Sequence, residues 1–339
     1  MHTAAWPLPF YGVRFRPVTL ALAALLVASA CGSGAGDGAA VGRAPDTAPT
    51  TTQAPTTIVT TTTEPDPATA TAVVTPAGIV APVISRAGDG WVVRTPCNAT
   101  ATLTRAKAKS AGSPVIVLDP GHGGAEPGAV SPGGLIEKDI NLAVARETKT
   151  ALEAAGVTTL ITRSGDYDVA LPTRSEIARA VNPKAFVSIH HNAEPDGPRD
   201  GPGTETYYQI GSTDSKRLAG LVYEEVVKAM SQYKVAWVAD RDAGAKYRPG
   251  TNGDYYAMLR QPGKVVSVLA ELAFITNQPE SLLLARPEVQ KVEGEAVARG
   301  IVRYLTTTDP GSGFVEPYPR IDPPSTGSAT PRPCHDPQL

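Results

Sequence analysis

The feature that most constrains the fold is an alternation, between residues 112 and 306, of short apolar segments with longer segments of helical periodicity. Short apolar runs predict buried strands, and apolar residues repeated every three or four positions predict helices. The predicted strands are Val115–Leu118, Val157–Thr162, Ala185–Ile189, Thr204–Gln209 and Val265–Glu271. The predicted helices are Glu137–Ala155, Arg174–Ala180, Ser212–Tyr233, Pro279–Ala285 and Pro287–Leu305. Such alternation is typical of a largely parallel sheet buried on both faces, so we predict a single three-layer α/β domain.

The first 31 residues have the pattern of an export signal. Two arginines, Arg14 and Arg16, precede a small and apolar run that is too short to span a bilayer. The run ends in Ala28-Ser29-Ala30-Cys31, which resembles a bacterial lipoprotein cleavage site, so we expect Cys31 to be the lipidated N-terminus. The alternatives are a secretory signal cleaved near Ala30 and an uncleaved anchor. We therefore expect the outer face of the cytoplasmic membrane, or the cell-wall space, as the location.

The other flanking segments differ in composition from the α/β domain. Residues 32–77 are mostly Gly, Ala, Thr and Pro and predict a disordered linker. Residues 78–111 contain a hairpin-like pattern around Gly88-Asp89-Gly90 and predict a small appendage, in which Pro82 is expected to confine its strand to an edge. Residues 307–339 form a Pro-rich tail. The catalytic or binding function is thus expected within 112–306.

Charge and cysteine content exclude several classes of protein. The 31 basic and 33 acidic residues give a net charge of −2, which argues against a nucleic-acid binder and against a polybasic membrane-surface protein. Three cysteines are too few for a disulfide scaffold or a Cys-rich zinc module. Cys97 and Cys334 flank the domain, and in an exported chain they are expected to form a disulfide bond. Two free thiols are the alternative.

The histidines of the domain all follow predicted strands. His122 lies in the loop Asp119–Gly124 after the first strand, and His190 and His191 directly follow the strand Ala185–Ile189. Because ligands bind beyond the carboxyl ends of strands in α/β sheets, histidines at two strand ends indicate a metal site. Glu137 begins a predicted helix 15 residues after His122, where the helix dipole favours a carboxylate.

Two histidines and one glutamate are a ligand set of catalytic zinc. His122, Glu137 and His190 would leave an open position for water, and zinc lowers the pKa of bound water toward 7. Such a site also needs a base, and Glu271 directly ends the apolar strand 265–270 on the same predicted rim. An acidic side chain at the end of a buried strand is costly without a function or a partner.

The residues at these strand ends resemble those of the zinc-dependent N-acetylmuramoyl-L-alanine amidases of the family-3 type. The matching segments are 115–124 (VIVLDPGHGG), 137–142 (EKDINL), 188–193 (SIHHNA) and 271–277 (ELAFITN), and the resemblance spans about 112–306. It implies one Zn²⁺ per chain on His122, Glu137 and His190, with Glu271 as catalytic glutamate. It further implies a sheet of about six strands and hydrolysis of the amide between N-acetylmuramic acid and L-alanine of the stem peptide.

Two positions depart from the family pattern. His191 stands where the family usually has a small residue, and Ala273 stands where a glycine is common. Successive strand residues point to opposite faces, so His190 and His191 are not equivalent ligands; His191 is expected to line the groove, contact substrate or hydrogen-bond to a ligand. Asn192 is a further substrate-contact candidate. Asp119 is expected to fix the His122 tautomer by contacting the ring without binding the metal.

Two other functions remain open at this point. A catalytically silent or autoinhibited relative would bind peptidoglycan or regulate another hydrolase, and a zinc peptidase would cut bonds within the stem peptide. The four site residues argue against the first, and the second lacks a His-Glu-x-x-His helix. We expect a monomer with a peptidoglycan or muropeptide substrate, no nucleic acid, and membrane attachment through Cys31 alone. Residues 235–255 are a lid, a partner-binding loop or plain surface.

Overall fold

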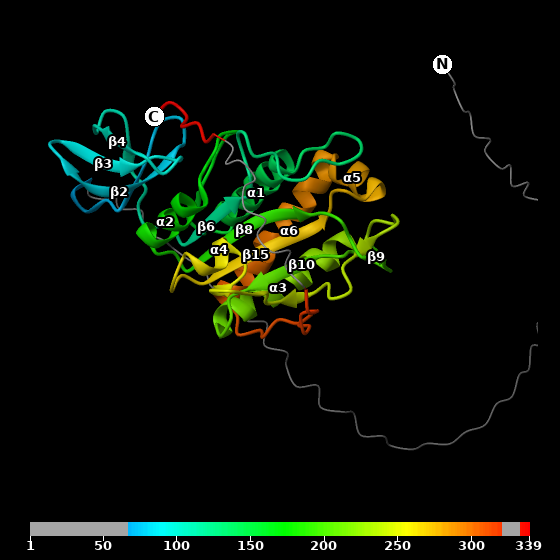
Figure 1. Ribbon diagram of the computed structural model, residues 1–339. Coiled ribbons are helices and arrows are strands. Elements are labelled where there is room, and N and C mark those ends of the chain that lie inside the picture. Colours follow the sequence, from blue (N-terminus) through cyan, green and yellow to red (C-terminus); the bar gives the residue numbers. More distant parts are fainter. Residues whose placement is uncertain (1–66, 321–332) are drawn as a thin grey trace, which may run out of the picture. The chain divides into compact units, whose positions relative to one another are not determined.

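A six-stranded mixed sheet forms the centre of the main domain (Figure 1). The computed structural model describes residues 67–320 and 333–339. The strands, in their order across the sheet, are β12 (Ala245–Lys246), β10 (Glu205–Tyr208), β15 (Ser267–Phe274), β8 (Ala185–Asn192), β6 (Ile116–Pro120) and β7 (Thr159–Ile161). Only β10 and β15 pair in antiparallel fashion; the other four neighbouring pairs in this sheet are parallel. The predicted mostly parallel α/β sheet is confirmed.

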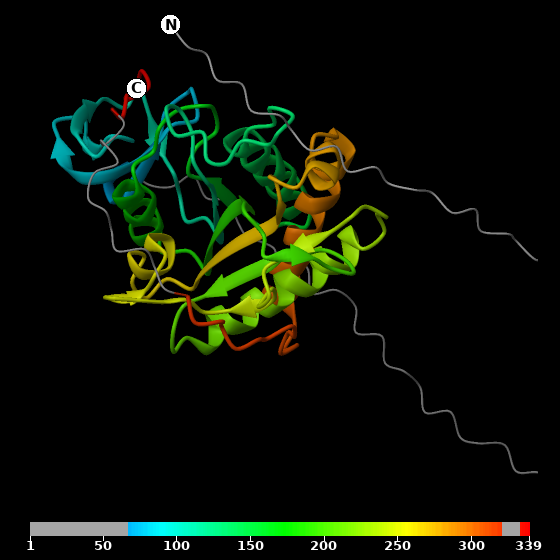
Figure 2. The ribbon, with the colours of Figure 1, turned by 45° about the vertical axis from the view of Figure 1, so that its right-hand side comes forward.

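Helices cover both faces of this sheet, as the nearly continuous burial of its strands requires. One face packs against α1 (Glu137–Ala154), α3 (Thr213–Met230) and α6 (Pro287–Thr306), and the other against α2 (Leu171–Val181) and α4 (Ala257–Arg260) (Figure 2). On β6, Ile116 and Leu118 belong to the first core and Val117 to the second. The remaining helix is α5 (Gln278–Leu284), which precedes α6. The three-layer prediction is therefore confirmed.

The appendage is larger than the predicted hairpin and begins earlier. It is a five-stranded antiparallel sheet in the order β4 (Thr100–Leu103), β3 (Gly90–Arg94), β2 (Val80–Ala87), β1 (Ala72–Val74) and β5 (Lys109–Ser110). Strand β1 lies inside the segment predicted to be linker, so the boundary at residue 78 is wrong. Ala72 and Val73 are buried between β2 and β5, and tertiary packing here outweighs the threonine-rich composition that predicted disorder.

Pro82 lies in an interior strand, against the prediction of an edge. The N–H of the next residue, Val83, donates to Thr71 on the β1 side. Since successive N–H groups point to opposite sides of a strand, the N–H that Pro82 lacks would point toward β3. Pairing of β2 with β3 begins only at Val83, so the proline interrupts no hydrogen bond of that ladder.

Most of the tail is also part of the folded structure. Phe314 forms a bridge with Ala245 on the edge strand β12, and Val315 donates its N–H to the Ala245 carbonyl. The predicted Cys97–Cys334 disulfide is confirmed. A tail defined only by its proline content is thus a poor description of 307–320, because its apolar side chains and backbone donors continue the domain.

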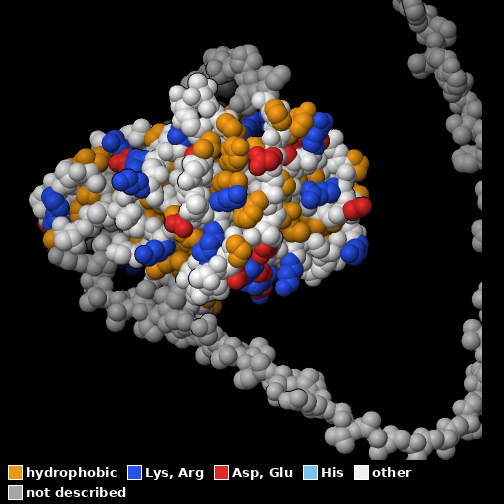
Figure 3. Space-filling model, turned by 90° about the horizontal axis from the view of Figure 1, so that it is seen from below, with side chains coloured by type: hydrophobic (Ala, Val, Ile, Leu, Met, Phe, Trp, Pro, Cys, Tyr) orange, Lys and Arg blue, Asp and Glu red, His pale blue; other side chains and the backbone are white. Residues whose placement is uncertain are grey.

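Several short elements complete the described chain: η1 (Pro67–Thr69), β9 (Gly197–Pro198), β11 (Val238–Ala239), β13 (Pro249–Gly250) and β14 (Gly253–Asp254). None of the helices in the described ranges has the length and apolarity needed to cross a membrane. The predicted signal at 1–31, Cys31 and residues 32–66 of the predicted linker lie outside the described residues. On the face shown in Figure 3, Lys and Arg side chains are interspersed with Asp and Glu, in line with the near-neutral composition.

Candidate metal centre and active site

Three functional side chains lie in one row across the central sheet. Glu205 on β10 pairs directly with Glu271 on β15, and Glu271 pairs directly with His190 on β8. Residues that face each other across neighbouring strands project to the same side of a sheet. The row is close to the carboxyl end of β8, and the segment 121–124 follows β6 at the same edge. Sheet register therefore brings groups together that are far apart in the sequence.

The structure brings together the three predicted metal ligands. Oε1 of Glu137 lies 3.1 Å from Nε2 of His122 and 3.1 Å from Nδ1 of His190. The ligand atoms of all three residues lie within 4.8 Å of one another. Glu137 is the first residue of α1, only 4% exposed, and its Oε2 accepts a hydrogen bond of 2.8 Å from the N–H of Ala129. The start of a helix and two strand ends thus meet at one carboxylate.

Close backbone approach makes room for the His190 ring. A Cβ atom on Gly121 would lie 2.1 to 2.5 Å from three atoms of the His190 imidazole, far inside contact distance. Gly121 is held against β8 by its own N–H, which donates to the carbonyl of Ile189. The glycine therefore serves as the surface on which the imidazole rests. The sequence predicted a loop at Asp119–Gly124, but the contact of Gly121 with His190 depends on the pairing of β6 with β8.

His122 has a backbone conformation that residues other than glycine rarely adopt. Its φ is +61°, in the left-handed region, where a side chain costs free energy. Two buried arginines stabilise the loop in this shape. Nη2 of Arg174 donates to the His122 carbonyl at 2.6 Å, and Arg163 donates to the carbonyls of Pro120 and Gly121 at 3.0 and 2.8 Å.

Asp119 acts on the site through Arg174 rather than through the ring of His122. Its carboxylate accepts from Nη1 of Arg174 at 2.8 Å and from the hydroxyls of Thr162 and Ser188 at 2.6 and 2.9 Å. The expectation that Asp119 fixes the His122 tautomer is therefore wrong, because its oxygens are directed to these partners. Removing one partner of such a buried ion pair typically costs about 3–5 kcal/mol.

Burial and neighbouring charges set the protonation of the ligands. Burial alone would raise the pKa of the Glu137 carboxyl, but the hydrogen bonds and charges of His122 and His190 lower it far below the usual range. Burial lowers the pKa of His190, although the nearby Glu137 carboxylate opposes that shift. An ionised carboxylate and a neutral imidazole are the forms that bind a metal ion.

Behind the ligands, a chain of buried polar side chains reaches the opposite face of the sheet. Nδ2 of Asn141, one turn along α1, donates to Oε1 of Glu137 at 3.1 Å. Oδ1 of Asn141 lies 2.8 Å from Nδ1 of His191, and Nε2 of His191 lies 3.5 Å from Glu293 on α6. His191 therefore does not line a groove. Of the roles considered for it, only the indirect contact with a ligand agrees with this position.

Glu271 lies beside the three predicted metal ligands and has a carboxylate oxygen that accepts no hydrogen bond from the described residues. This oxygen, Oε2, is buried. Burial, followed by the charges of Glu137 and Glu205, raises the pKa of Glu271 well above its ordinary value. A raised pKa makes a carboxylate a stronger base toward a nearby water. Glu271 thus has the environment that a general base requires.

Glu205, which the sequence analysis missed, carries its own counterion. Nζ of Lys246 lies 2.8 Å from Oε1 of Glu205 and 2.6 Å from Oδ1 of Asp242, and all three residues are buried. Oε2 of Glu205 accepts from the Tyr207 hydroxyl at 2.6 Å and from Nδ2 of Asn192 at 3.2 Å. Asn192 thus contacts the neighbour of Glu271. Strand register was the missing signal, since Glu205 and Glu271 are 66 positions apart in the printed sequence.

The donor set fits a zinc ion. Tetrahedral zinc with bonds of about 2.1 Å separates its ligand atoms by about 3.4 Å. The two 3.1 Å separations at Glu137 Oε1 are close to that value, and the donors are two nitrogens and one carboxylate oxygen. Three protein ligands leave a coordination position for a reacting group, as in catalytic rather than structural zinc sites.

Comparison with known proteins matches residues 116–303, more than half of the chain, to the N-acetylmuramoyl-L-alanine amidase family. An N-acetylmuramoyl-L-alanine amidase of Neisseria meningitidis, AmiC, is 31% identical over 58% of this chain and 53% of its own length. The uncharacterized protein YqiI of Bacillus subtilis is 35% identical over 60% of this chain and 92% of its own. The solved amidase AmiC2 of Nostoc punctiforme is 35% identical, with a TM-score of 0.48 over 57% of this chain and 98% of that one. The chain thus spans about half the length of the Neisseria relative.

The contact between Gly121 and His190 predicts a specific effect of one methyl group. We expect Gly121→Ala to weaken zinc binding by about tenfold or more, because the imidazole must move away from the other two ligands. Competition with a fluorescent zinc chelator measures the affinity. Gly133→Ala is the matched control, because the nearest atom to its added Cβ is 3.8 Å away. Equal zinc affinities of the two variants would contradict the assigned ligand geometry.

Proposed function

Because the chain belongs to the N-acetylmuramoyl-L-alanine amidase family, we propose that it hydrolyses the amide between N-acetylmuramic acid and L-alanine of the peptidoglycan stem peptide. His122, Glu137 and His190 hold one Zn²⁺ per chain, and Glu271 is the general base. The observation that carries the proposal is the direct pairing of Glu271 with His190, which puts a carboxylate oxygen without a hydrogen-bond partner in the described part of the chain beside the three ligands.

The metal and the side chains make different contributions to the reaction. When bound, zinc lowers the pKa of a water molecule and polarises the scissile carbonyl. Glu271 accepts a proton from the attacking water as the water oxygen bonds to the carbonyl carbon. It then delivers that proton to the alanine nitrogen, which leaves as an amine when the carbon–nitrogen bond breaks. The products are the free lactyl carboxylate of the sugar and a stem peptide with a free amino terminus.

The surrounding residues keep the reacting groups in position. Asn141 orients the Glu137 carboxylate, and His191 orients Asn141 from the far side of the sheet. The negative charge of Glu205 helps to keep the pKa of Glu271 high, while Lys246 limits the repulsion between the two acids. Such supporting contacts typically change metal affinity or activity by about 10- to 100-fold when they are removed.

Replacement of the proposed base separates metal binding from turnover. We expect Glu271→Gln to retain zinc, because Glu271 is not one of the three ligands, and to lower turnover on purified peptidoglycan by about 100- to 10,000-fold. Zinc content by atomic absorption and release of free amino groups are the two measurements. Glu288→Gln, which replaces an acid at the start of α6, serves as control and is expected to cleave at the wild-type rate. Turnover by Glu271→Gln at the control rate would end the assignment of the base.

We propose further that the protein is exported as a lipoprotein and acts as a monomer at the outer face of the cytoplasmic membrane or in the cell wall. The support is the signal-like segment 1–31, the small residues before Cys31, and the location of peptidoglycan. The disulfide between Cys97 and Cys334 agrees with an oxidising compartment.

Metabolic labelling with a clickable fatty acid tests the anchor. We expect label on the wild-type protein and none on Cys31→Ser, because the thiol of Cys31 is the attachment point. Cys97→Ser also removes a cysteine but leaves Cys31 in place, so its label should persist. Equal labelling of wild type and Cys31→Ser, or no label on wild type, would refute lipidation at this residue.

A further inference from the structure

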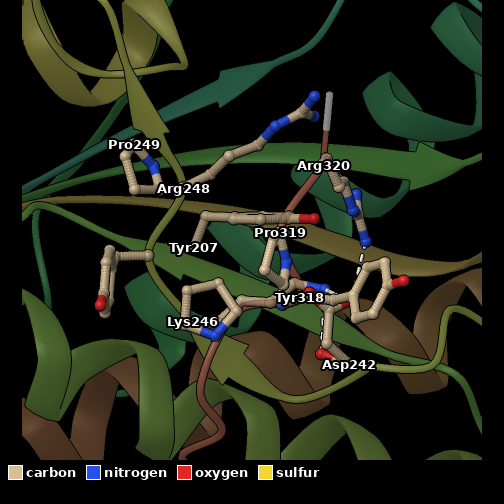
Figure 4. A pocket seen from close by; sticks show the side chains of 10 residues that line it. Tyr207, Asp242, Lys246, Arg248, Pro249, Tyr318, Pro319 and Arg320 are labelled. Carbon is tan, nitrogen blue, oxygen red and sulfur yellow. Dashed lines mark hydrogen bonds and ion pairs between the residues drawn. The ribbon is translucent and has the colours of Figure 1, made fainter. Parts of the chain in front are cut away.

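The folded part of the tail builds one wall of a pocket beside the catalytic row. Residues 314–320 first run alongside the edge strand β12, where Phe314 forms a bridge with Ala245. They then contact the segment that precedes β12 in the sequence, where the N–H of Tyr318 donates to Oδ2 of Asp242 at 2.7 Å. Arg320 follows and forms ion pairs of 2.6 Å with Asp240 and 2.7 Å with Asp242. Figure 4 shows Tyr318, Pro319 and Arg320 alongside Tyr207 and Asp242.

The pocket has a volume of about 290 Å³ and a lining that combines cations with tyrosine rings. Lys246, Arg248 and Arg320 line it together with Tyr207 and Tyr318, and among the described residues Asp242 is its one acidic lining residue. Nη2 of Arg320 makes both ion pairs that this residue forms within 67–320 and 333–339, while a guanidinium carries five N–H donors in a planar fork. Such a fork matches the two oxygens of a carboxylate.

The neighbouring acids do not make this a second metal site. Glu205, Asp240 and Asp242 have oxygen atoms close enough together to hold a cation. Lys246 and Arg320 already occupy the space between them, with contacts of 2.6 to 2.8 Å. The acids therefore act as an internal counterion group that holds the cations at the pocket wall.

Two lining side chains, Tyr207 and Lys246, connect the pocket to the catalytic row, and Nζ of Lys246 lies 2.8 Å from Oε1 of Glu205. The Tyr207 ring lines the pocket, and its hydroxyl donates to Glu205, the direct cross-strand partner of Glu271. Tyr207 and Glu205 are two positions apart on β10 and lie on the same face of the sheet. A group bound in the pocket is thus only a few residues of peptide away from an amide at Glu271.

We infer that this pocket binds a carboxylate of the peptide on the amine side of the scissile bond, with Arg320 as the residue that selects an acidic peptide. The inference rests on the proposed amidase function, since it assigns the pocket to the leaving stem peptide. It also gives the tail a role in substrate selection, because the selecting guanidinium comes from residues 307–320 rather than from the strands and helices of the domain.

Peptide binding tests this independently of catalysis. The probes are the dipeptide L-Ala-D-Glu and the same dipeptide with both carboxylates converted to amides, titrated into the full chain by calorimetry. We expect the wild type to bind the acidic dipeptide about tenfold tighter than the amide, and Arg320→Ala to lose most of that preference. Arg303→Ala is the matched control: Arg303 also forms ion pairs, with Glu224 and Glu225 on α3 and with Asp309 beyond α6, and its removal should leave the preference unchanged.

A variant that increases the affinity for the acidic dipeptide excludes a merely structural effect. Asp240→Asn removes one carboxylate that competes for Arg320, so we expect it to bind the acidic dipeptide more tightly than the wild type. Equal affinities for the two dipeptides, equal effects of Arg320→Ala and Arg303→Ala, or weaker binding by Asp240→Asn would each overturn the assignment. Arg320-dependent binding without cleavage of peptidoglycan would refute the amidase proposal alone, whereas cleavage without acidic preference would refute the pocket alone.

Discussion

One carboxylate oxygen connects the parts of this structure that form the site. Oε1 of Glu137 lies within 3.1 Å of ring nitrogens of His122 and His190, accepts from the Asn141 amide at 3.1 Å, and accepts from the backbone N–H of His191 at 3.3 Å. These contacts come from a loop, a strand and a helix. A buried carboxylate is tolerated only when such partners compensate for its lost hydration, so the same contacts that stabilise the charge also fix the ligand geometry.

The loop that carries His122 shows how the fold holds an unfavourable local conformation. A left-handed histidine costs free energy, and the buried Arg163 and Arg174 offset that cost by donating to the carbonyls of Pro120 and of His122 itself. Arg174 is in turn fixed by Asp119 on β6. The strain is thus located in a ligand residue, while the side chains that compensate for it are buried. Rigid support of this kind is what precise metal coordination requires.

Periodicity and residue type predicted much of this arrangement. The alternation of strands and helices gave the layers, and the rule that ligands gather at the carboxyl ends of strands brought His122 and His190 to one edge. Glu205, Asn141 and Glu293 could not be predicted, because their proximity to the site depends on strand register and helix packing rather than on spacing. The role of Arg320 was hidden for another reason: a proline-rich composition does not indicate which residues return to the domain.

The central claim is that this row of side chains, with a metal ion at its ligands, cleaves the bond between the lactyl group and L-alanine. Mass spectrometry of peptidoglycan fragments digested by the protein, with zinc and with a chelator, tests it most directly. The account predicts chelator-sensitive release of intact stem peptide with a free alanine amine, leaving sugar that bears a lactyl group. Cleavage within the peptide, or zinc-loaded protein that leaves the fragments intact, would contradict it.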